Sequence, residues 1–152
     1  MNLRELSILD PAVQRFLFEH ADPSMFRHDY TPLDGLNYMV NRCVNDGAKV
    51  IGDIEAGFCF FAEQRNPKVL EPHIIGDGTK LREATRQGMA LAAALGYERM
   101  IIWTLDERLV RIAEKSGFRL CGRIPGLHLQ ADALRDVFVL EMELTICGTL
   151  LP

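Results

Sequence analysis

In this 152-residue chain, the stretch Ile74-Ile75-Gly76-Asp77-Gly78-Thr79-Lys80-Leu81 joins an apolar strand to a helix. The helix, predicted over residues 79–95, carries apolar side chains at intervals of three and four and ends at Gly96. A second apolar strand, residues 98–105, follows it. Two strands joined by a crossover helix run parallel in one sheet, so this stretch predicts a parallel pair.

The two glycines of this turn indicate an anion site. Gly76 and Gly78 flank a turn that opens a helix, where backbone N–H groups are unpaired and meet the positive end of the helix dipole. Such a helix start binds phosphate groups. A tight turn in which both glycines adopt positive φ, without any ligand, explains the pattern equally well. Lys80 lacks the spacing of a Walker A loop, and Leu81 stands where a dinucleotide fingerprint needs a third glycine.

Upstream of the turn, the pattern predicts helices followed by an antiparallel meander. Residues 49–55, 57–63 and 69–75 alternate as strands joined by short connections. Pro72 in the third strand belongs at a bulge or an edge, because it has no N–H to donate. Two amphipathic helices precede the meander, one starting at Asp10-Pro11 and one capped by Asp34.

Downstream, Asp106 caps a short helix that Gly117 ends, and residues 118–122 and 138–144 read as further strands. The whole order predicts one α+β domain over residues 1–152, with no repeat or linker. Leu150 to Pro152 and the alternating last strand could add an edge to a neighbour, which allows a homo-oligomer or an assembly partner.

Composition and charge argue against several classes of function. The net charge is −4 and no Lys/Arg run exceeds two residues, which disfavours nucleic-acid binding. Neither a signal peptide nor a membrane span is apparent, so we expect a cytoplasmic protein. The four cysteines stand far apart with no histidine at metal spacing, which indicates reduced thiols and no metal site: Cys43, Cys59, Cys121 and Cys147.

Asp106 to Phe118 is similar to the pattern N-x-x-A-x-x-L-Y-x-x-x-G-F of the GNAT superfamily of acyl-CoA-dependent N-acyltransferases. The order of elements resembles that family over essentially the whole chain, and the motif resemblance spans roughly Glu71 to Gly122. The meander length and the strand with His73 look most like compact members encoded by bacteriophages. The resemblance implies a GNAT-like mixed sheet of about six to seven strands with helices on both faces.

The resemblance also implies a site for acetyl-CoA as co-substrate, without a metal. In that fold the fourth and fifth strands splay apart and hold the pantetheine chain between them, while amides at the helix entry hold the pyrophosphate. Lys80 and Arg82 could add charge-assisted contacts to the phosphates. Asp106 takes the family's asparagine position, or serves only as a helix cap. The implied cofactor-binding residues are Ile74, Ile75, Gly76, Asp77, Gly78, Thr79, Lys80, Leu81 and Asp106.

The alignment of the glycine turn with the family's [QR]-x-x-G-x-[GA] loop stays open. Matching Gly76 and Gly78 to its two small residues puts His73 where Gln or Arg is expected, whereas matching Gly78 alone shifts the register by two.

Acetyl transfer to an amine needs a general base near the splay. Glu71 and His73 are the titratable residues of that strand, and a spacing of two puts them on one face. If that face lines the substrate groove, His73 is the base and Glu71 orients it; if it faces the helices, the two form a structural pair. The family's thiolate-protonating tyrosine falls at Ala113, so water or His128 would supply that proton, although His128 is expected in a surface loop.

Two functions follow. The first is an N-acetyltransferase acting on a small-molecule or protein amine by direct attack in a ternary complex. The second is a non-catalytic GNAT-fold protein that binds or assembles, for example within a phage particle. His28, Asp29 and Tyr30 are candidates for acceptor contact by position. The aromatic residues Phe58, Phe60, Phe61 and Trp103 are expected in the core.

Overall fold

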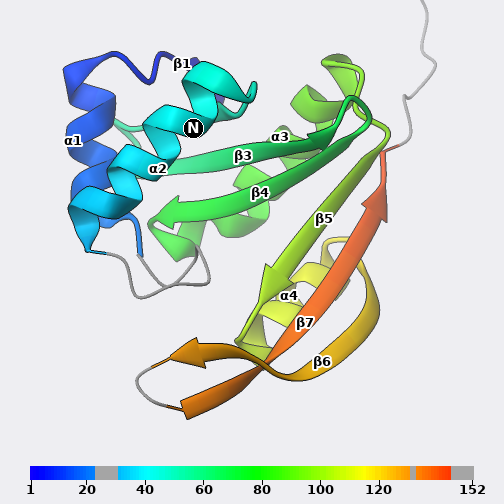
Figure 1. The fold of residues 1–152 in the computed structure, drawn as a ribbon. Coiled ribbons are helices and arrows are strands. Elements are labelled where there is room, and N and C mark those ends of the chain that lie inside the picture. Colours follow the sequence, from blue (N-terminus) through cyan, green and yellow to red (C-terminus); the bar gives the residue numbers. More distant parts are fainter. Residues whose placement is uncertain (23–30, 131–132, 145–152) are drawn as a thin grey trace, which may run out of the picture.

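The computed structural model describes residues 1–22, 31–130 and 133–144. Within them, one mixed sheet has seven strands in the order β1-β2-β3-β4-β5-β7-β6 (Figure 1). All neighbouring strands are antiparallel except β4 and β5. The predicted α+β fold is confirmed. Its elements are β1 (Arg4–Leu6), α1 (Pro11–His20), α2 (Pro32–Asn45), β2 (Lys49–Asp53), β3 (Phe58–Asn66), β4 (Val69–Gly76), the 3₁₀ helix η2 (Gly78–Lys80), α3 (Leu81–Ala94), β5 (Arg99–Thr104), α4 (Glu107–Lys115), β6 (Arg119–Gln130) and β7 (Ala133–Glu143).

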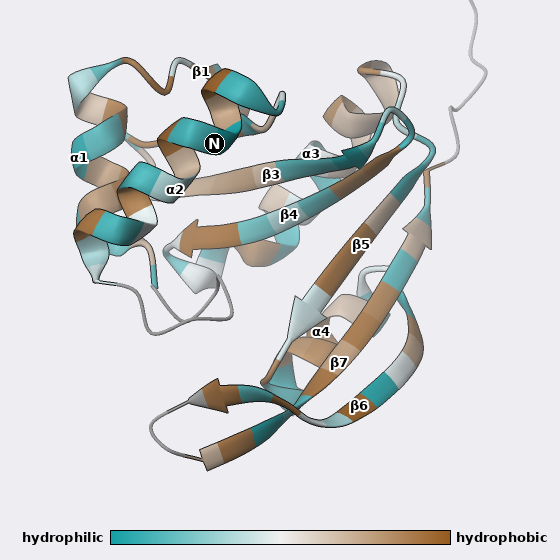
Figure 2. Ribbon diagram, in the orientation of Figure 1, coloured by the Kyte–Doolittle hydropathy of each residue, from teal (hydrophilic) through white to brown (hydrophobic). Residues whose placement is uncertain are grey.

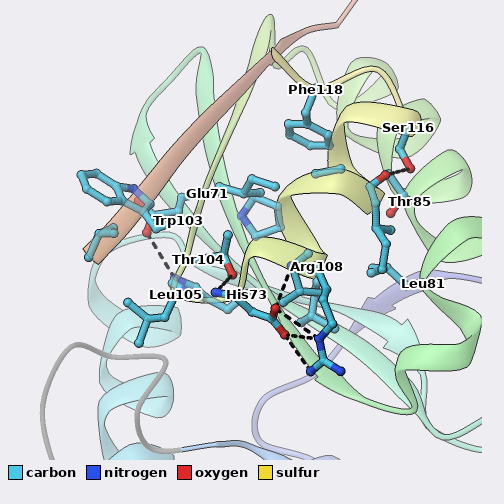
Figure 3. Close-up of a pocket in the computed structure, with 18 of the residues that line it drawn as sticks. Glu71, His73, Leu81, Thr85, Trp103, Thr104, Leu105, Arg108, Ser116 and Phe118 are labelled. Carbon is cyan, nitrogen blue, oxygen red and sulfur yellow. Dashed lines mark hydrogen bonds and ion pairs between the residues drawn. The ribbon is translucent and has the colours of Figure 1, made fainter. Parts of the chain in front are cut away.

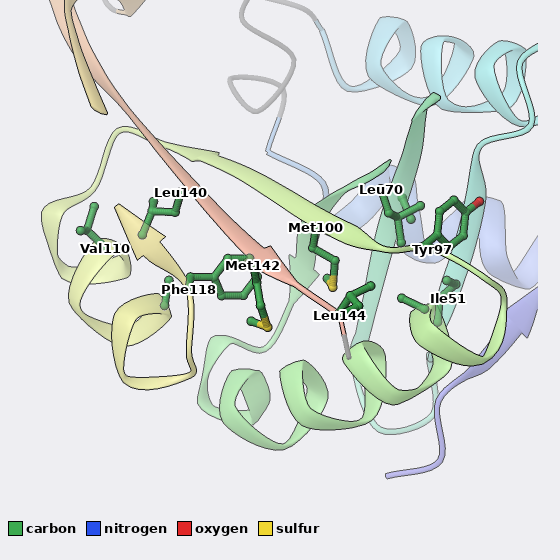
Figure 4. Packing of buried hydrophobic residues seen from close by; sticks show 12 residues of the cluster. Ile51, Leu70, Tyr97, Met100, Val110, Phe118, Leu140, Met142 and Leu144 are labelled. Carbon is green, nitrogen blue, oxygen red and sulfur yellow. The ribbon is translucent and has the colours of Figure 1, made fainter. Parts of the chain in front are cut away.

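Helices cover both faces of the sheet, because the strands carry apolar side chains on both of their faces. On one face α3 and α4 bury a cluster with strand residues such as Leu70, Met100 and Leu140 (Figure 4). On the other face α1 and α2 pack on Phe61 and Ile75. Figure 2 shows β5 and the middle of β7 as hydrophobic strands, as expected for strands in the interior of a sheet.

The helix starts follow local capping chemistry. Asp10 accepts a hydrogen bond from the amide of Ala12 at the start of α1, as predicted. The predicted cap of α2 is wrong by three residues. Thr31 is the N-cap, and Asp34 is the N3 residue of a capping box with it. An acid at N3 and a Thr-Pro before it are the signature of this box, and the prediction took the acid for the cap.

The two parallel strands separate soon after they meet. Only Val69 and Leu70 of β4 pair with β5, at Arg99 and Met100. Figure 1 shows the two strands diverging from that point. Pro72 lies two residues beyond Leu70, so it sits on a part of β4 that is paired on the β3 side alone. The prediction that this proline belongs at an edge is confirmed, because this half of β4 has an open edge.

The C-terminal half differs most from the prediction. β6 is far longer than residues 118–122 and pairs with β7 to form a long hairpin. β7 is an interior strand, paired with β5 and β6, so it offers no free edge to a neighbour. The short strand β1, which pairs with β2, was not predicted.

Several predictions concern residues that the structure leaves undescribed. His28, Asp29, Tyr30, Cys147 and the segment 150–152 lie outside the described ranges. The other three cysteines are free thiols, of which Cys59 is buried, Cys43 half-buried and Cys121 exposed. Among the described residues, no helix has both the length and the apolar character needed to span a membrane.

Candidate active site

A cavity of about 640 Å³ occupies the gap between β4 and β5. Leu81, Thr85 and Ala113 line it from the side of α3 and α4. Glu71 and His73 line it from β4 and point to the opposite face, because they alternate with Leu70 and share a face with Ile75. Figure 3 shows the side chains of Glu71 and Trp103 on one side of the opening and Phe118 and Ser116 by α4 on the other. The cavity therefore joins the two faces of the sheet.

The glycine turn borders this cavity, whose wall includes Ile74 before it and Leu81 after it. Gly76 has a φ of +100°, and a Cβ there would lie 2.3 Å from the carbonyl oxygen of Gly57. Gly78 has no such φ, and a Cβ there would meet nothing within 4 Å. The prediction that both glycines need positive φ is thus wrong for Gly78. Gly76 allows the close approach of two chain segments, while Gly78 leaves the turn unshielded.

The unpaired amides predicted for this turn are largely paired within the protein. The amide of Asp77 donates to Gly57 O at 2.9 Å, and that of Lys80 donates to Asp77 O at 3.2 Å. The amide of Leu81 donates to Gly78 O. Asp77 Oδ1 accepts from the amide of Thr79 at 2.9 Å and from its hydroxyl at 2.7 Å, and these bonds lower the pKa of Asp77. An acid, rather than an anion from solution, caps this helix start.

The two cations predicted at the turn behave differently. Lys80 Nζ donates to the carbonyl oxygen of Ala56, which ties the turn to the β2–β3 connection. Arg82 lies exposed in the first turn of α3.

On the opposite face, β4 joins β3 and α2 in a buried polar cluster. His73 Nε2 lies 2.9 Å from Glu63 Oε2 and 3.5 Å from Glu71 Oε1. Glu63 also accepts from Tyr38 Oη at 2.7 Å and from Arg42 Nε at 2.9 Å. The sequence predicts Glu71 as the partner of His73, but the nearer carboxylate belongs to Glu63, on the neighbouring strand.

Charge within this cluster is balanced by arginines. Burial would raise the pKa of Glu63, but hydrogen bonds from His73, Tyr38 and Arg42 outweigh burial and lower it to about 2. Burial, together with the bond to Glu63, raises the pKa of Tyr38 to about 12, so its phenol stays a donor. Glu63 is therefore a carboxylate near neutral pH although only 2% of its surface is exposed.

Glu71 is held by a different cation. Arg65 Nε donates to its Oε2, and the Glu71 side chain is buried. Ligand atoms of Glu63, Glu71 and His73 lie within 4.8 Å of one another, close enough to hold a metal ion. Arg42 and Arg65 already bring positive charge to these carboxylates, so we assign no metal here.

The side of the cavity at α4 carries the residues of the family-like motif. Asp106 lines the cavity and caps α4, accepting from the amide of Arg108 at 2.7 Å, which confirms its predicted role as a cap. Bonds from Arg108 lower the pKa of Asp106. Ala113, at the tyrosine position, is buried against the cavity and brings no proton donor to it.

Two predictions about cavity residues were wrong. Trp103 lines the cavity and is half-buried, whereas Phe58, Phe60 and Phe61 are in the core as predicted. His128 was expected in a surface loop, but it lies in β6, is buried and lines the cavity. The strand β6 carries it there, because β6 extends well beyond the predicted residues 118–122.

Sequence comparison gives no relative: no family model matches the chain, and no curated protein sequence matches it. Solved structures match it well. A spermidine N-acetyltransferase from Vibrio cholerae, in complex with CoA and spermine, has a TM-score of 0.75 over 94% of this chain and 95% of that one. The chain has the GNAT fold.

Two further structures agree. A GNAT superfamily phosphinothricin acetyltransferase from Sinorhizobium meliloti, in complex with acetyl-CoA, has a TM-score of 0.72 over 94% of this chain and 88% of that one. A Salmonella typhimurium protein with its cofactor acetyl-CoA has a TM-score of 0.72 over 98% and 96%. Identities with all three are 14–16%, a level that shows the fold alone.

Proposed function

We propose that this protein is an N-acyltransferase that transfers the acetyl group of acetyl-CoA to an amine by direct attack in a ternary complex. The observation that carries the proposal is the cavity through the sheet. It joins a face covered by α3 and α4 to a face with a histidine held by carboxylates, in a fold whose solved neighbours were crystallised with acetyl-CoA or CoA. A donor and an acceptor can meet in such a passage from opposite sides.

The open edge of β4 fits the pantetheine chain of acetyl-CoA. Beyond Leu70, no described strand pairs with β4 on the β5 side, so backbone groups from Glu71 onward face the cavity region without a ladder. Amide groups of a pantetheine chain can pair with such an edge, as an added strand would. On this proposal Ile74 and Ile75 supply backbone contacts.

The pyrophosphate would lie at the start of η2 and α3, by Gly76, Asp77, Gly78, Thr79, Lys80 and Leu81, with Asp106 near the cofactor. The helix dipole, Lys80 and Arg82 favour an anion there. The Asp77 carboxylate opposes one. Gly78 adds no side chain, which leaves space for a bulky phosphate group.

His73 is the proposed general base. Its Nε2 faces the carboxylates of Glu63 and Glu71, so this nitrogen carries the proton and Nδ1 is the nitrogen that accepts one. The attacking amine gives its proton to Nδ1 as its nitrogen bonds to the carbonyl carbon, and Glu63 stabilises the resulting imidazolium. The C–S bond then breaks, and water protonates the leaving thiolate because Ala113 has no acidic group.

A non-catalytic GNAT-fold protein is the second candidate. Ala113 in place of the family's acid and the acidic cap at Asp77 favour it. On this candidate the cavity would bind a ligand or partner without turnover. A bacteriophage origin, a cytoplasmic location and an assembly partner stay predictions from the sequence.

The two candidates differ in one measurement. Acetyl-CoA is mixed with the protein and a panel of amines, free thiol is followed over time, and acetylated product is identified by mass spectrometry. Thiol release that depends on an amine, with the matching acetylated product, supports the enzyme. Tight acetyl-CoA binding with no product from any small-molecule or peptide amine supports the non-catalytic protein.

A further inference from the structure

Two nitrogen-bearing side chains line the cavity at its end near the β6–β7 hairpin. His128 of β6 and Arg135 of β7 are direct partners in the ladder of this hairpin. Cross-strand partners have neighbouring Cβ atoms, so the imidazole and the guanidinium project together. Figure 1 shows the hairpin reaching past the end of β5, where the gap between β4 and β5 is widest.

These two side chains lie on the same face of the sheet as His73. Leu140 and Met142 of β7 pack in the cluster under α3 and α4. Side chains alternate between the two faces along a strand, and Arg135 is an odd number of residues from both, so it points to the other face. Trp103 is three residues from Met100, which packs under α3 and α4, so Trp103 lies on that other face of the sheet. Glu71 and His73 lie on the same face as Trp103. The pair thus lies on the hairpin side of the cavity, on the same face of the sheet as the proposed base.

Neither side chain has a hydrogen-bond or ion-pair partner among the described residues. His128 is only 3% exposed and its ring bonds to no described residue, whereas Arg135 is exposed and forms no ion pair with one. Nearly all other arginines of the strands are paired, for example Arg123 with Asp136 and Arg119 with Glu141. Because both side chains line the cavity, the His128 imidazole and the Arg135 guanidinium can donate hydrogen bonds to a ligand there.

We propose that His128 and Arg135 bind an anionic group of the acceptor, whose amine then lies near His73. The inference rests on the proposed function, because it describes the acceptor of that reaction. Arginine pairs with carboxylate and phosphate-type oxygens in a two-pronged geometry, and an imidazole N–H adds a third donor. The acceptor class is therefore a small amine that also carries a carboxylate or a phosphonate.

Charge on the two sides of the opening is consistent with such an acceptor. The acidic side chains of Asp22 and Glu71 line the cavity on the α1 and β4 side, where Arg65 also pairs with Glu71. Arg135 supplies the opposite charge on the hairpin side. A polyamine without an acidic group would meet the guanidinium with its own positive charge, and would bind less well.

Binding of matched probes tests the proposal without requiring turnover. Protein saturated with CoA is titrated by calorimetry with sets of three compounds. Each set shares one carbon skeleton and consists of an amino acid, its aminoalkylphosphonate and the amine that lacks the acid. Acetyl-CoA binding is measured first, so a failed proposed function is seen separately. We expect an acidic member of a set to bind about 10- to 100-fold more tightly than the plain amine. The carboxylate and phosphonate arms show which anion is preferred.

Variants separate the subsite from general charge effects. Arg135→Gln removes the guanidinium and should abolish the preference for the acidic probe, while Arg135→Lys should keep part of it. Arg86→Gln, at an exposed position of α3 outside the cavity, changes the net charge equally and should leave the preference unchanged. Equal binding of acidic and plain amines by the wild type would overturn the proposal. So would a preference that survives in Arg135→Gln, or no binding of any probe to CoA-loaded protein.

Discussion

Glu63 connects three elements through one carboxylate. It accepts from Tyr38 and Arg42 of α2, and its other oxygen faces His73 of β4. Because burial weakens competition from water, these bonds hold the imidazole in one orientation. The ring of His73 also stacks on Phe61 of β3. The proposed base is thus held by residues of the neighbouring strand β3, which α2 in turn supports through Tyr38 and Arg42.

Glu63→Gln should destabilise the protein in a pH-dependent way. The pKa of Glu63 falls from 4.5 to about 2 on folding, so the carboxylate stabilises the fold above about pH 4.5 and loses this effect as pH falls toward 2. Urea unfolding at neutral pH should show a loss of about 2–3 kcal/mol. The difference in the free energy of unfolding between Glu63→Gln and wild type should become smaller as the pH falls below 4.5. Glu55→Gln, at an exposed position, is the control, and a gap that stays constant down to pH 3 would contradict this account.

His73→Gln should slow catalysis without weakening the donor complex. Loss of a general base typically costs 10²- to 10⁴-fold, so we expect kcat to fall by at least about 100-fold while the Kd for acetyl-CoA changes little. Steady-state kinetics and calorimetry on the same preparation give both numbers. Glu63→Gln should retain more activity than His73→Gln, since it acts by positioning the ring. A His73→Gln enzyme with wild-type kcat would exclude this base.

The sequence reveals site residues that are close together along one strand better than those that meet across two strands. Glu71 and His73 are two apart on one strand, so their common face follows from periodicity alone. Glu63 lies opposite Glu71 in the β3–β4 ladder, and that pairing depends on the hairpin register, including a shift between Gln64 and Asn66. Had the register been known, the alternation Phe61-x-Glu63 would have placed this acid beside His73.

At the scale of elements, the strand-to-helix turn uses its glycines differently. Gly76→Ala should cost at least about 2 kcal/mol, because a Cβ at φ +100° is strained and meets the Gly57 carbonyl. Gly78→Ala should change the free energy of unfolding by no more than about 0.5 kcal/mol, since its Cβ would point into open space. Thermal or urea unfolding of the pair checks both. Equal costs at the two positions would show that the turn differs from this structure.

The separation of β4 from β5 has one signal in the sequence. Pro72 cannot donate to a ladder, and β4 loses its β5 partner just before it. Helices and strands with clear periodicity were predicted with nearly correct bounds, as α1, β2 and α3 show. The hairpin of β6 and β7 was underestimated, because its exposed residues, such as Leu127 and Leu129, break the simple alternation between apolar and polar positions.

For the whole molecule, the fold could be predicted because it depends on the order of helices and strands along the chain. A meander followed by a crossover helix leaves few ways to arrange the sheet. The cavity could not be predicted, since its walls come from segments as distant as β4, α4 and the β6–β7 hairpin. His128 and Arg135 illustrate this limit: their role depends on how far the hairpin extends and which face it presents.

On the proposed function, acetyl-CoA binds at the gap between β4 and β5 with its phosphates at the glycine turn. Calorimetric titration of acetyl-CoA into wild type, Gly78→Ala and Gly78→Glu tests this binding site. We expect a Kd on the order of micromolar for the first two and at least about tenfold weaker binding by Gly78→Glu, whose charge and bulk enter the open side of the turn without disturbing the fold. No binding by folded wild type at millimolar acetyl-CoA, or equal binding by Gly78→Glu, would contradict the account.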